Sequence, residues 1–293
     1  MFRVGILGSE NSHAMAFSKY FNGIDKTYLG EFDDIEVVGT FSRYPEANEA
    51  LQKEAGVPYI AERPEDLLGK VDAVMVTARD GRYHAAYARP FIEAGIPAFI
   101  DKPLTSDGEE AIELVRLAKK KGVPLVGGSS LKLCEGTKQM AALVRREPEK
   151  VIGGSIYAPV KMVNDYGGFY FYSSHLAEIS LSVFGYDPEW VMASQTKHGV
   201  GVLVHYKDYD VSNHFSQDMG QYGGTVITTD GPTTTQISMD CAYVEECRSF
   251  ARMLRAGQME FTYEQLAMPV VYLNAIDKSM QTGQSVAVEK IVL

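Results

Sequence analysis

The stretch that decides the fold is FRVGILGSENSH, from Phe2 to His13. Its first half is an apolar run that predicts a short strand, and from about Ser12 the residues follow a helical pattern. The turn between them holds Gly8 and several residues that favour a helix N-cap. A strand, a glycine turn and a helix in this order are typical of the first unit of a Rossmann-type nucleotide-binding fold.

Short apolar strands and helical patterns continue to alternate up to about residue 127. Continuous apolar strands separated by helices indicate a parallel sheet that is covered on both faces. The predicted strands are 2–7, 36–41, 71–76, 98–100 and 123–126, and the predicted helices start near 12 and cover 45–55, 82–94 and 106–121.

The pattern changes after Gly127-Gly128, because several strands then follow one another without helices between them. Such a run indicates an antiparallel sheet. The expected strands are 151–157, 188–196, 199–206, 222–229, 233–239 and 285–291, with helices at 135–146, 168–184, 243–256 and 264–281. The sequence therefore predicts an α/β protein of two domains. Residues 1–127 form a doubly wound Rossmann dinucleotide-binding domain, and residues 128–293 form an α+β domain with a mainly antiparallel open sheet.

Composition narrows the class of protein. The chain has 293 residues, more than a usual single domain, with 45% hydrophobic and 23% charged residues. Its net charge of -10 argues against a nucleic-acid partner. The three cysteines lack disulfide or metal spacing, the first apolar run is too short for a signal peptide, and no apolar run approaches a membrane span. We expect a cytoplasmic protein with no membrane partner.

The turn after the first strand is an incomplete phosphate-binding loop. Gly8 stands at the first glycine of the dinucleotide fingerprint, while Glu10 and His13 replace the second and third. We expect the backbone and side chains of this loop to contact the cofactor, at Gly8, Ser9, Asn11 and Ser12. Two unit charges about 6 Å apart repel by about 3 kcal/mol at a dielectric constant of about 20, so Glu10 would weaken pyrophosphate binding. The alternative is a connection in a domain that has lost its nucleotide.

The end of the second strand bears on the choice of cofactor. NAD-specific domains place an acidic residue here to accept the ribose hydroxyls, whereas this chain has Ser42-Arg43. A serine beside an arginine suits a 2'-phosphate, so the cofactor is NADP or NAD, with NADP favoured. The alternative for Arg43 is a solvated surface residue.

The most specific stretch is Phe99 to Leu104, where a strand is followed by Asp101-Lys102-Pro103. It resembles the Glu-Lys-Pro motif of the Gfo/Idh/MocA family of oxidoreductases, with aspartate in place of glutamate. Residues 76–79 and 84–88 are similar to the family's fourth strand and next helix, without the expected Asn and Pro near 78–79. Further similarity covers Gly167-Gly168, the helix with His175, and residues 246–288.

The resemblance implies an enzyme and assigns roles to single residues. Lys102 would hold the substrate hydroxyl beside the nicotinamide, and His175 would be the general base. Thr77, His84 and Asp101 would belong with Lys102 to the cofactor site. This chemistry is reasonable, because hydride loss from a carbinol requires loss of the hydroxyl proton and histidine accepts protons near neutral pH. The alternatives are a surface lysine and a core histidine.

One departure affects the catalytic helix. The family has an aspartate four residues before the histidine, and this chain has Phe171. Tyr172 or Glu178 can supply a polar partner to His175 instead. We therefore predict a substrate site of Lys102, Tyr172, His175 and Asp165, with Asn164 as a further candidate. The aromatic run 169–172 is either a stacking wall for a ring-shaped substrate or core packing.

The predicted function follows from these residues. We expect an NAD(P)-dependent oxidoreductase that acts on a hydroxyl or carbonyl of a sugar, inositol or related polyol. The alternatives are a non-catalytic binding or regulatory protein on the same fold, and a lyase or hydrolase with a tightly bound nucleotide as redox relay. No histidine lies in a metal-binding pattern, so no protein-bound metal is predicted. A homodimer or homotetramer through the second sheet, including residues 199–205, is expected.

Overall fold

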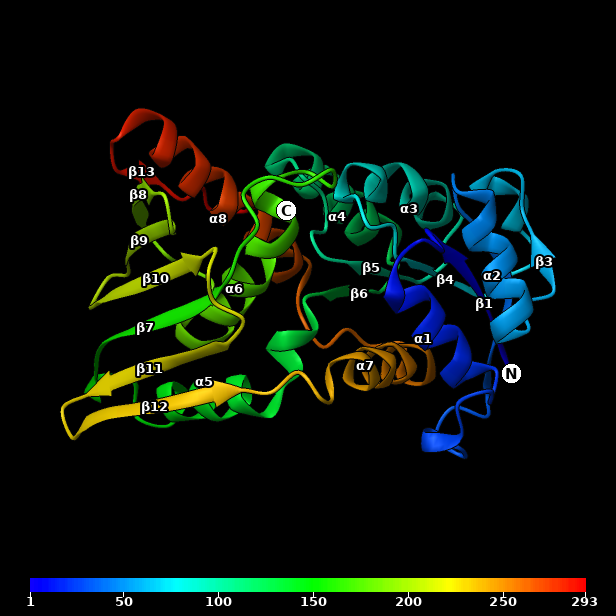
Figure 1. Ribbon diagram of the computed structural model, residues 1–293, viewed down its shortest axis with the longest axis horizontal. Coiled ribbons are helices and arrows are strands. Elements are labelled where there is room, and N and C mark those ends of the chain that lie inside the picture. Colours follow the sequence, from blue (N-terminus) through cyan, green and yellow to red (C-terminus); the bar gives the residue numbers. More distant parts are fainter.

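The computed structural model describes residues 1–293 and shows two sheets side by side, with helices packed on and between them (Figure 1). The first sheet is entirely parallel, in the order β3-β2-β1-β4-β5-β6. Its strands are β1 (Phe2–Leu7), β2 (Ile35–Phe41), β3 (Tyr59–Ile60), β4 (Ala73–Val76), β5 (Ala98–Asp101) and β6 (Leu125–Gly128). The strand order reverses between β1 and β4, and such sheets bind ligands beyond the carboxyl ends of the strands at this reversal.

The helices of this part connect successive strands and cover both faces of the sheet. They are α1 (Ser12–Phe21), α2 (Pro45–Ala55), α3 (His84–Glu93) and α4 (Gly108–Lys121), with short 3-10 turns at Lys26–Tyr28, Pro64–Leu67 and Gly81–Tyr83. Helix α4 shows why these segments are helical. The Asp107 carboxylate accepts from the Glu110 amide at its start, and Gly122 ends it with a left-handed φ of 67°.

The second sheet has seven strands in the order β12-β11-β7-β10-β9-β8-β13. They are β7 (Val151–Pro159), β8 (Trp190–Thr196), β9 (Gly199–His205), β10 (Asp210–Ser216), β11 (Tyr222–Thr228), β12 (Gly231–Ile237) and β13 (Val286–Ala287). Only the β7–β10 pair is parallel. The predicted fold class, a Rossmann sheet followed by an α+β part with a mainly antiparallel open sheet, is confirmed.

The strand prediction was wrong at β10, which was not expected although it lies near the centre of the sheet. Its residues are mostly polar, and the amide of Asn213 is buried inside. That amide donates to Ser180 Oγ at 3.0 Å and to Tyr272 Oη at 2.7 Å, so a polar residue lies between the buried Val211 and Phe215 and interrupts the apolar pattern of the inward face. The short β3 was also missed, and β13 has two residues rather than the longer strand predicted at 285–291.

Four helices belong to the second half of the chain. They are α5 (Glu135–Arg146), α6 (Phe169–Phe184), α7 (Ala242–Ala256) and α8 (Tyr263–Thr282), with 3-10 turns at Ser130–Leu133 and Pro148–Lys150. Helix α7 returns to the first sheet, where Phe250 shares a core with Ile6 and Phe17. The predicted domain boundary at 127/128 stays a prediction, and the first sheet is covered partly by a helix from beyond it (Figure 1).

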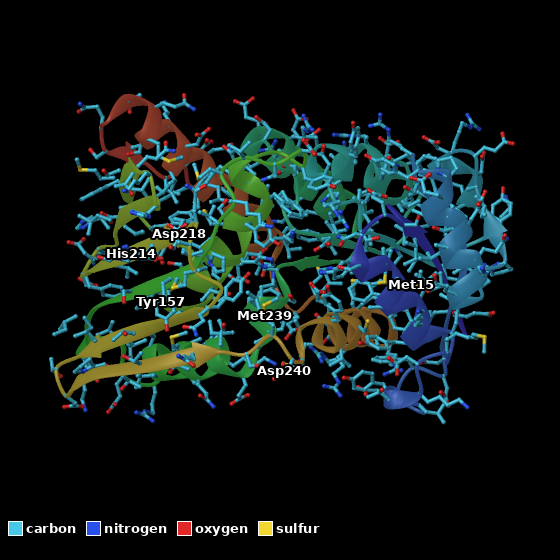
Figure 2. All side chains as sticks on the ribbon, viewed as in Figure 1. Met15, Tyr157, His214, Asp218, Met239 and Asp240 are labelled. Atoms are coloured by element: carbon cyan, nitrogen blue, oxygen red, sulfur yellow. The ribbon has the colours of Figure 1, made fainter.

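The second sheet buries one face under helices and leaves the other face open. In β9, Val200, Val202 and Val204 are buried and only Leu203 of the predicted apolar run is exposed. The open face carries Tyr157 and His214, which are register partners on β7 and β10 (Figure 2). No helix is long and apolar enough to cross a membrane.

Candidate active site

The turn after β1 is held tightly against the end of β4. Gly8 has a φ of 103°, and a Cβ at this position would lie 2.2 Å from the Ala78 backbone nitrogen. Thr77 Oγ1 donates to the Gly8 carbonyl at 3.0 Å, and Ser9 Oγ donates to Asn48 Oδ1 at 2.7 Å. Only glycine fits at the first position of the fingerprint, because the chain must approach the neighbouring strand end so closely. Thr77 and Ser9 thus shape the loop.

The N-terminus of α1 opens onto a cavity. Asn11 is the N-cap residue, but its side chain does not cap the helix and donates instead to Asp101 Oδ2 at 2.9 Å. The Ser12 hydroxyl lies 2.9 Å from the Tyr243 hydroxyl. The first amides of α1 therefore keep their capacity to bind an anion, which is the usual place of a pyrophosphate in this fold. These features fit a dinucleotide.

Glu10 connects the ends of three strands. Its carboxylate accepts from Ser42 Oγ at 2.6 Å and from the Arg79 amide at 3.1 Å. Arg79 also donates to the Glu10 carbonyl at 3.1 Å and to Tyr166 Oη at 3.2 Å. The Ser42 hydroxyl is thus engaged by a carboxylate, while the Arg43 guanidinium lies 4.3 Å from the centre of the Tyr83 ring.

Two cavities lie at this edge of the sheet and share Arg79 and Tyr166 in their walls. We call them the Lys102 cavity, of about 400 Å³, and the Arg43 cavity, of about 260 Å³. The Lys102 cavity is lined by residues of both halves of the chain, including Asn11, Ser12, Lys102, Asn164, Tyr172 and His175. The Arg43 cavity includes Glu10, Arg43, Tyr83, Tyr87 and Asp165.

Lys102 follows β5 and reaches toward the start of α6. Its Nζ donates to the Phe171 carbonyl at 3.2 Å and lies 4.1 Å from the centre of the Phe171 ring. The residue is buried, and burial lowers the pKa of the ammonium. A lysine in this state is a well-positioned hydrogen-bond donor for a hydroxyl in the cavity.

His175 lies on α6 in the wall of the same cavity. Its Nδ1 is 2.7 Å from Ser129 Oγ, and its Nε2 has no partner in the protein. Burial, with Lys102 second, lowers the pKa of the imidazole well below 6.5, so the ring is neutral at pH 7. The structure therefore brings together the two residues predicted to be catalytic. The role of each stays a prediction.

The hydrogen-bond partner of His175 is neither of the two residues that the sequence suggested. Glu178 does not contact the imidazole, because its carboxylate accepts from the Ser129 amide and from Lys132 Nζ, both at 2.6 Å. Tyr172 lies with its ring centre 6.1 Å from that of His175 and lines the cavity. The polar partner of His175 is the Ser129 hydroxyl, and the Glu178 carboxylate accepts a hydrogen bond from the backbone amide of Ser129.

Other predicted site residues lie near the site without lining the Lys102 cavity. His84 is fully buried, and its two ring nitrogens are each 2.7 Å from a carbonyl oxygen, of Pro103 and of Ala78. It holds together the loops after β4 and β5. Asp101 is buried beneath α1, and Asp165 lines the Arg43 cavity rather than the Lys102 cavity.

Sequence reasoning missed several residues of the Lys102 cavity. Arg79 and Ser130 follow the ends of β4 and β6, so their position at the carboxyl edge of a parallel sheet was a usable signal. Tyr222 and Tyr243 come from the second half of the chain, and no local pattern marks them. Further lining residues of this kind are Lys161, Tyr166 and Met239, and His13 at the start of α1 also lines the cavity.

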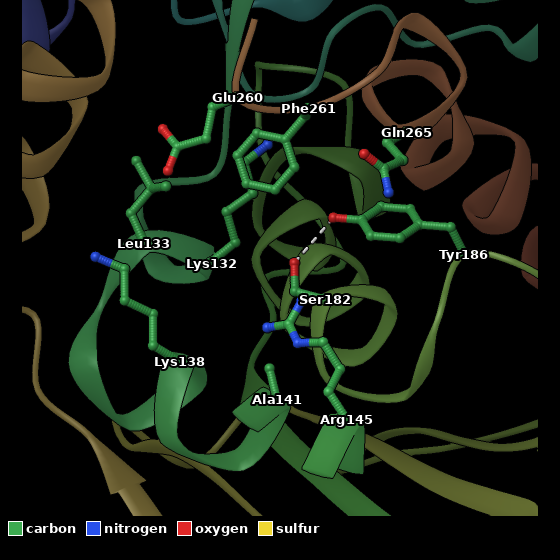
Figure 3. Close-up of a pocket in the computed structure, with 10 residues that line it drawn as sticks. All are labelled: Lys132, Leu133, Lys138, Ala141, Arg145, Ser182, Tyr186, Glu260, Phe261 and Gln265. Carbon is green, nitrogen blue, oxygen red and sulfur yellow. Dashed lines mark hydrogen bonds between the residues drawn. The ribbon is translucent and has the colours of Figure 1, made fainter. Parts of the chain in front are cut away.

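A further cavity, of about 260 Å³, lies beside α5 (Figure 3). The Ser182 and Tyr186 hydroxyls, 3.0 Å apart, lie in its wall. Its basic side chains include Lys132 and Lys138, which form ion pairs with Glu178 and Glu245. Lys132 thus supports the Glu178–Ser129 contact described above, while Arg145 in the same wall forms no ion pair.

The strand order, the glycine turn and the free helix N-terminus define a Rossmann protein of the dinucleotide-binding class. Residues 2–129 match the model of a family described as oxidoreductase family, NAD-binding Rossmann fold. This is the Gfo/Idh/MocA family, and the match covers the N-terminal part of the chain, slightly less than half of its length.

Known proteins are similar to this chain over a short stretch of sequence or in fold. An inositol 2-dehydrogenase of Corynebacterium glutamicum (strain R) is 41% identical over 54 residues, which are 18% of this chain and 16% of that relative. The structure of scyllo-inositol dehydrogenase from Lactobacillus casei, with bound NAD(H) and scyllo-inositol, gives a TM-score of 0.83 at 14% identity, over 98% of this chain and 99% of that chain. GenD2 from gentamicin A biosynthesis, in complex with NAD, gives 0.85 at 16% identity, over 98% of this chain and 96% of that chain. At these identities the structural likeness shows the fold.

Proposed function

We propose that the protein is an NAD(P)-dependent oxidoreductase that transfers hydride between a nicotinamide and a CH–OH group of a sugar, inositol or related polyol. The observation that carries the proposal is the placement of Lys102 and His175 in one cavity, beside the free N-terminus of α1. The names of the inositol dehydrogenases with this fold support the substrate class.

The residues of the first sheet would hold the cofactor. The turn at Gly8, with Asn11 and Ser12 at the start of α1, would bind the pyrophosphate through backbone amides. When bound, the nicotinamide supplies the hydride acceptor or donor. The Arg43 cavity would hold the adenosine half, with Tyr83 and Arg43 as its walls.

Lys102 and His175 would bind the substrate hydroxyl and remove its proton. The Lys102 ammonium would donate a hydrogen bond to the substrate oxygen and so orient it. His175 would accept the hydroxyl proton at Nε2, since the contact of Nδ1 with Ser129 fixes the ring orientation. The Glu178 carboxylate accepts a hydrogen bond from the Ser129 backbone amide and so keeps Ser129 in place.

The Glu10 carboxylate bears on the preference for NADP or NAD. The sequence favours NADP through Ser42 and Arg43, but Ser42 donates to the Glu10 carboxylate. This carboxylate stands at the end of β2, where NAD-specific domains place an acidic residue, and would repel a 2'-phosphate. We therefore propose NAD as the better ligand and keep Arg43 as the group that would still permit NADP.

A binding measurement tests the function. Melting temperature is followed with NAD, NADH, NADP and NADPH in the presence of a chelator. A ligand at a hundredfold excess over its Kd stabilises by about 2.7 kcal/mol, which is a rise of about 5–10 °C for a protein of this size. Lys102→Met and His175→Gln should keep this shift while polyol oxidation falls by about a hundredfold or more.

Two results would contradict the enzyme. No shift with any dinucleotide at millimolar concentration would favour a non-catalytic binding protein, an alternative supported by the engaged Glu10 and by Phe171. Unchanged turnover in both variants would reject the roles of Lys102 and His175. Dinucleotide binding without oxidation of any polyol would also favour a non-catalytic binding protein.

We propose further that a second copy of the chain covers the open face of the second sheet, in a homodimer or homotetramer. Met192 and Leu203 are register partners on β8 and β9 and are 50% and 38% exposed on this face. On the same face, Ser212 is the register partner of Leu203 on β10, and the Trp190 and His205 rings stack beside the pair.

A further inference from the structure

Three buried side chains from distant parts of the chain lie together beneath the Lys102 cavity. They are His13 of α1, Asp101 at the end of β5 and Glu246 of α7, which are 7%, 0% and 1% exposed. His13 Nδ1 is 3.0 Å from Asp101 Oδ2 and 3.5 Å from Glu246 Oε2. One such atom from each residue lies within 4.8 Å of the other two.

The cluster is not satisfied by the protein. Neither oxygen of Glu246 accepts a hydrogen bond, and His13 Nδ1 makes none of good geometry. Asp101 is different, because it accepts from the Asn11 side chain and the Lys102 backbone amide. A protonated His13 offers a single N–H at Nδ1, which serves one carboxylate at most and leaves the other bare. Such a buried carboxylate is costly, so a missing partner is expected.

The spacing matches the ligands of a metal ion. Ligand atoms about 2.1 Å from an ion are about 3.0 Å apart at octahedral angles and about 3.4 Å apart at tetrahedral angles. The observed separations of 3.0 and 3.5 Å lie at these values. One imidazole nitrogen with two carboxylate oxygens is a donor set for borderline divalent ions rather than for Ca²⁺ or Mg²⁺.

We propose that His13, Asp101 and Glu246 bind one divalent transition-metal ion of the Zn²⁺ or Mn²⁺ class. The surroundings hold the ligands in place, since Asn11 donates to Asp101 and the Tyr243 ring packs edge-on against His13 at 4.5 Å. The ammonium of Lys102, bonded to the Phe171 carbonyl, is directed toward α6.

The proposed ion borders the space where a substrate would bind. His13 lines the Lys102 cavity, together with Asn11 and Tyr243. Coordination positions not used by the protein are therefore within reach of a hydroxyl or carboxylate ligand in that cavity. The proposal does not depend on a dinucleotide, because the three ligands are complete without one.

The test measures metal binding directly. Tag-free protein is stripped with a chelator, dialysed against ZnCl₂ or MnCl₂ and analysed for metal content, with MgCl₂ as a hard-ion comparison. We expect one Zn²⁺ or Mn²⁺ per chain and a higher melting temperature. Glu246→Gln and His13→Gln should each weaken binding by at least about a hundredfold. His198→Gln removes an exposed histidine beside Asp218 and should leave binding unchanged.

Glu246→Gln also tests whether a loss of metal binding is caused by misfolding of the variant. It keeps the size of the side chain and replaces a buried carboxyl group that has no hydrogen-bond partner, so its metal-free melting temperature should not fall. Anomalous diffraction from crystals grown with Zn²⁺ should place the ion between the three residues. Absence of stoichiometric binding, equal affinity in Glu246→Gln, or an ion located elsewhere would each overturn the proposal.

Discussion

His175 combines burial, a single hydroxyl partner and an open nitrogen. The buried imidazole stays neutral because burial, with the Lys102 ammonium second, lowers its pKa well below 6.5. Its state is thus decided by packing around α6 rather than by the residue type. The same holds for Lys102, whose pKa burial also lowers. The side chains packed around Lys102 and His175 thus lower the pKa of both groups.

This burial predicts a pH dependence of stability. In the unfolded chain the imidazole gains a proton as pH falls through about 6.5, while the folded protein keeps it neutral to lower pH. The free energy of unfolding should therefore decrease below about pH 6.5, by at most about 1.4 kcal/mol per pH unit from this group.

Denaturant titrations between about pH 5 and pH 7.5 measure that slope. His175→Gln cannot take up the proton in either state, so the slope should become smaller in this variant. An equal slope in both proteins would contradict the neutral, buried state of His175.

At the scale of the element, β10 shows a strand that is held by buried polar contacts. The Asn213 side chain bonds to Ser180 of α6 and Tyr272 of α8, and so ties the sheet to both helices. Asn213→Val should cost about 2–3 kcal/mol of unfolding free energy, because the Tyr272 and Ser180 hydroxyls lose their partner in the core.

Ser212→Val is the matched control for this element. Ser212 lies on the same strand and faces the open side of the sheet, where a β-branched residue is tolerated. Its unfolding free energy should change by less than about 0.5 kcal/mol. Comparable losses in the two variants would show that the buried amide network does not stabilise the strand.

At the scale of the whole molecule, the open face of the second sheet predicts association. Light scattering should give the mass of a dimer or tetramer for the wild type. Leu203→Glu places a charge on the open face of β9 and should yield monomers, because a buried unpaired carboxylate opposes association. Leu29→Glu, at a residue 69% exposed in the first half of the chain, should leave the mass unchanged. A monomeric wild type would contradict the proposed assembly.

Local pattern predicted most of the elements. The strands of the first sheet other than β3, and the helices α2 and α5, follow the sequence closely, because their apolar period and caps are local properties. The position of Lys102 at the carboxyl end of a parallel strand was likewise readable. Strand β10 was not, because the burial of its central Asn213 depends on partners in α6 and α8.

The sequence by itself determined the Rossmann order, the glycine turn at Gly8 and the candidates Lys102 and His175. Only the tertiary structure decided that Ser129 is the partner of His175, that Glu10 bridges β1, β2 and β4, and that His13, Asp101 and Glu246 meet. The physical reason is that the first group depends on periodicity and backbone conformation within one segment. The second depends on contacts between segments that are far apart in the chain, for which no spacing pattern exists.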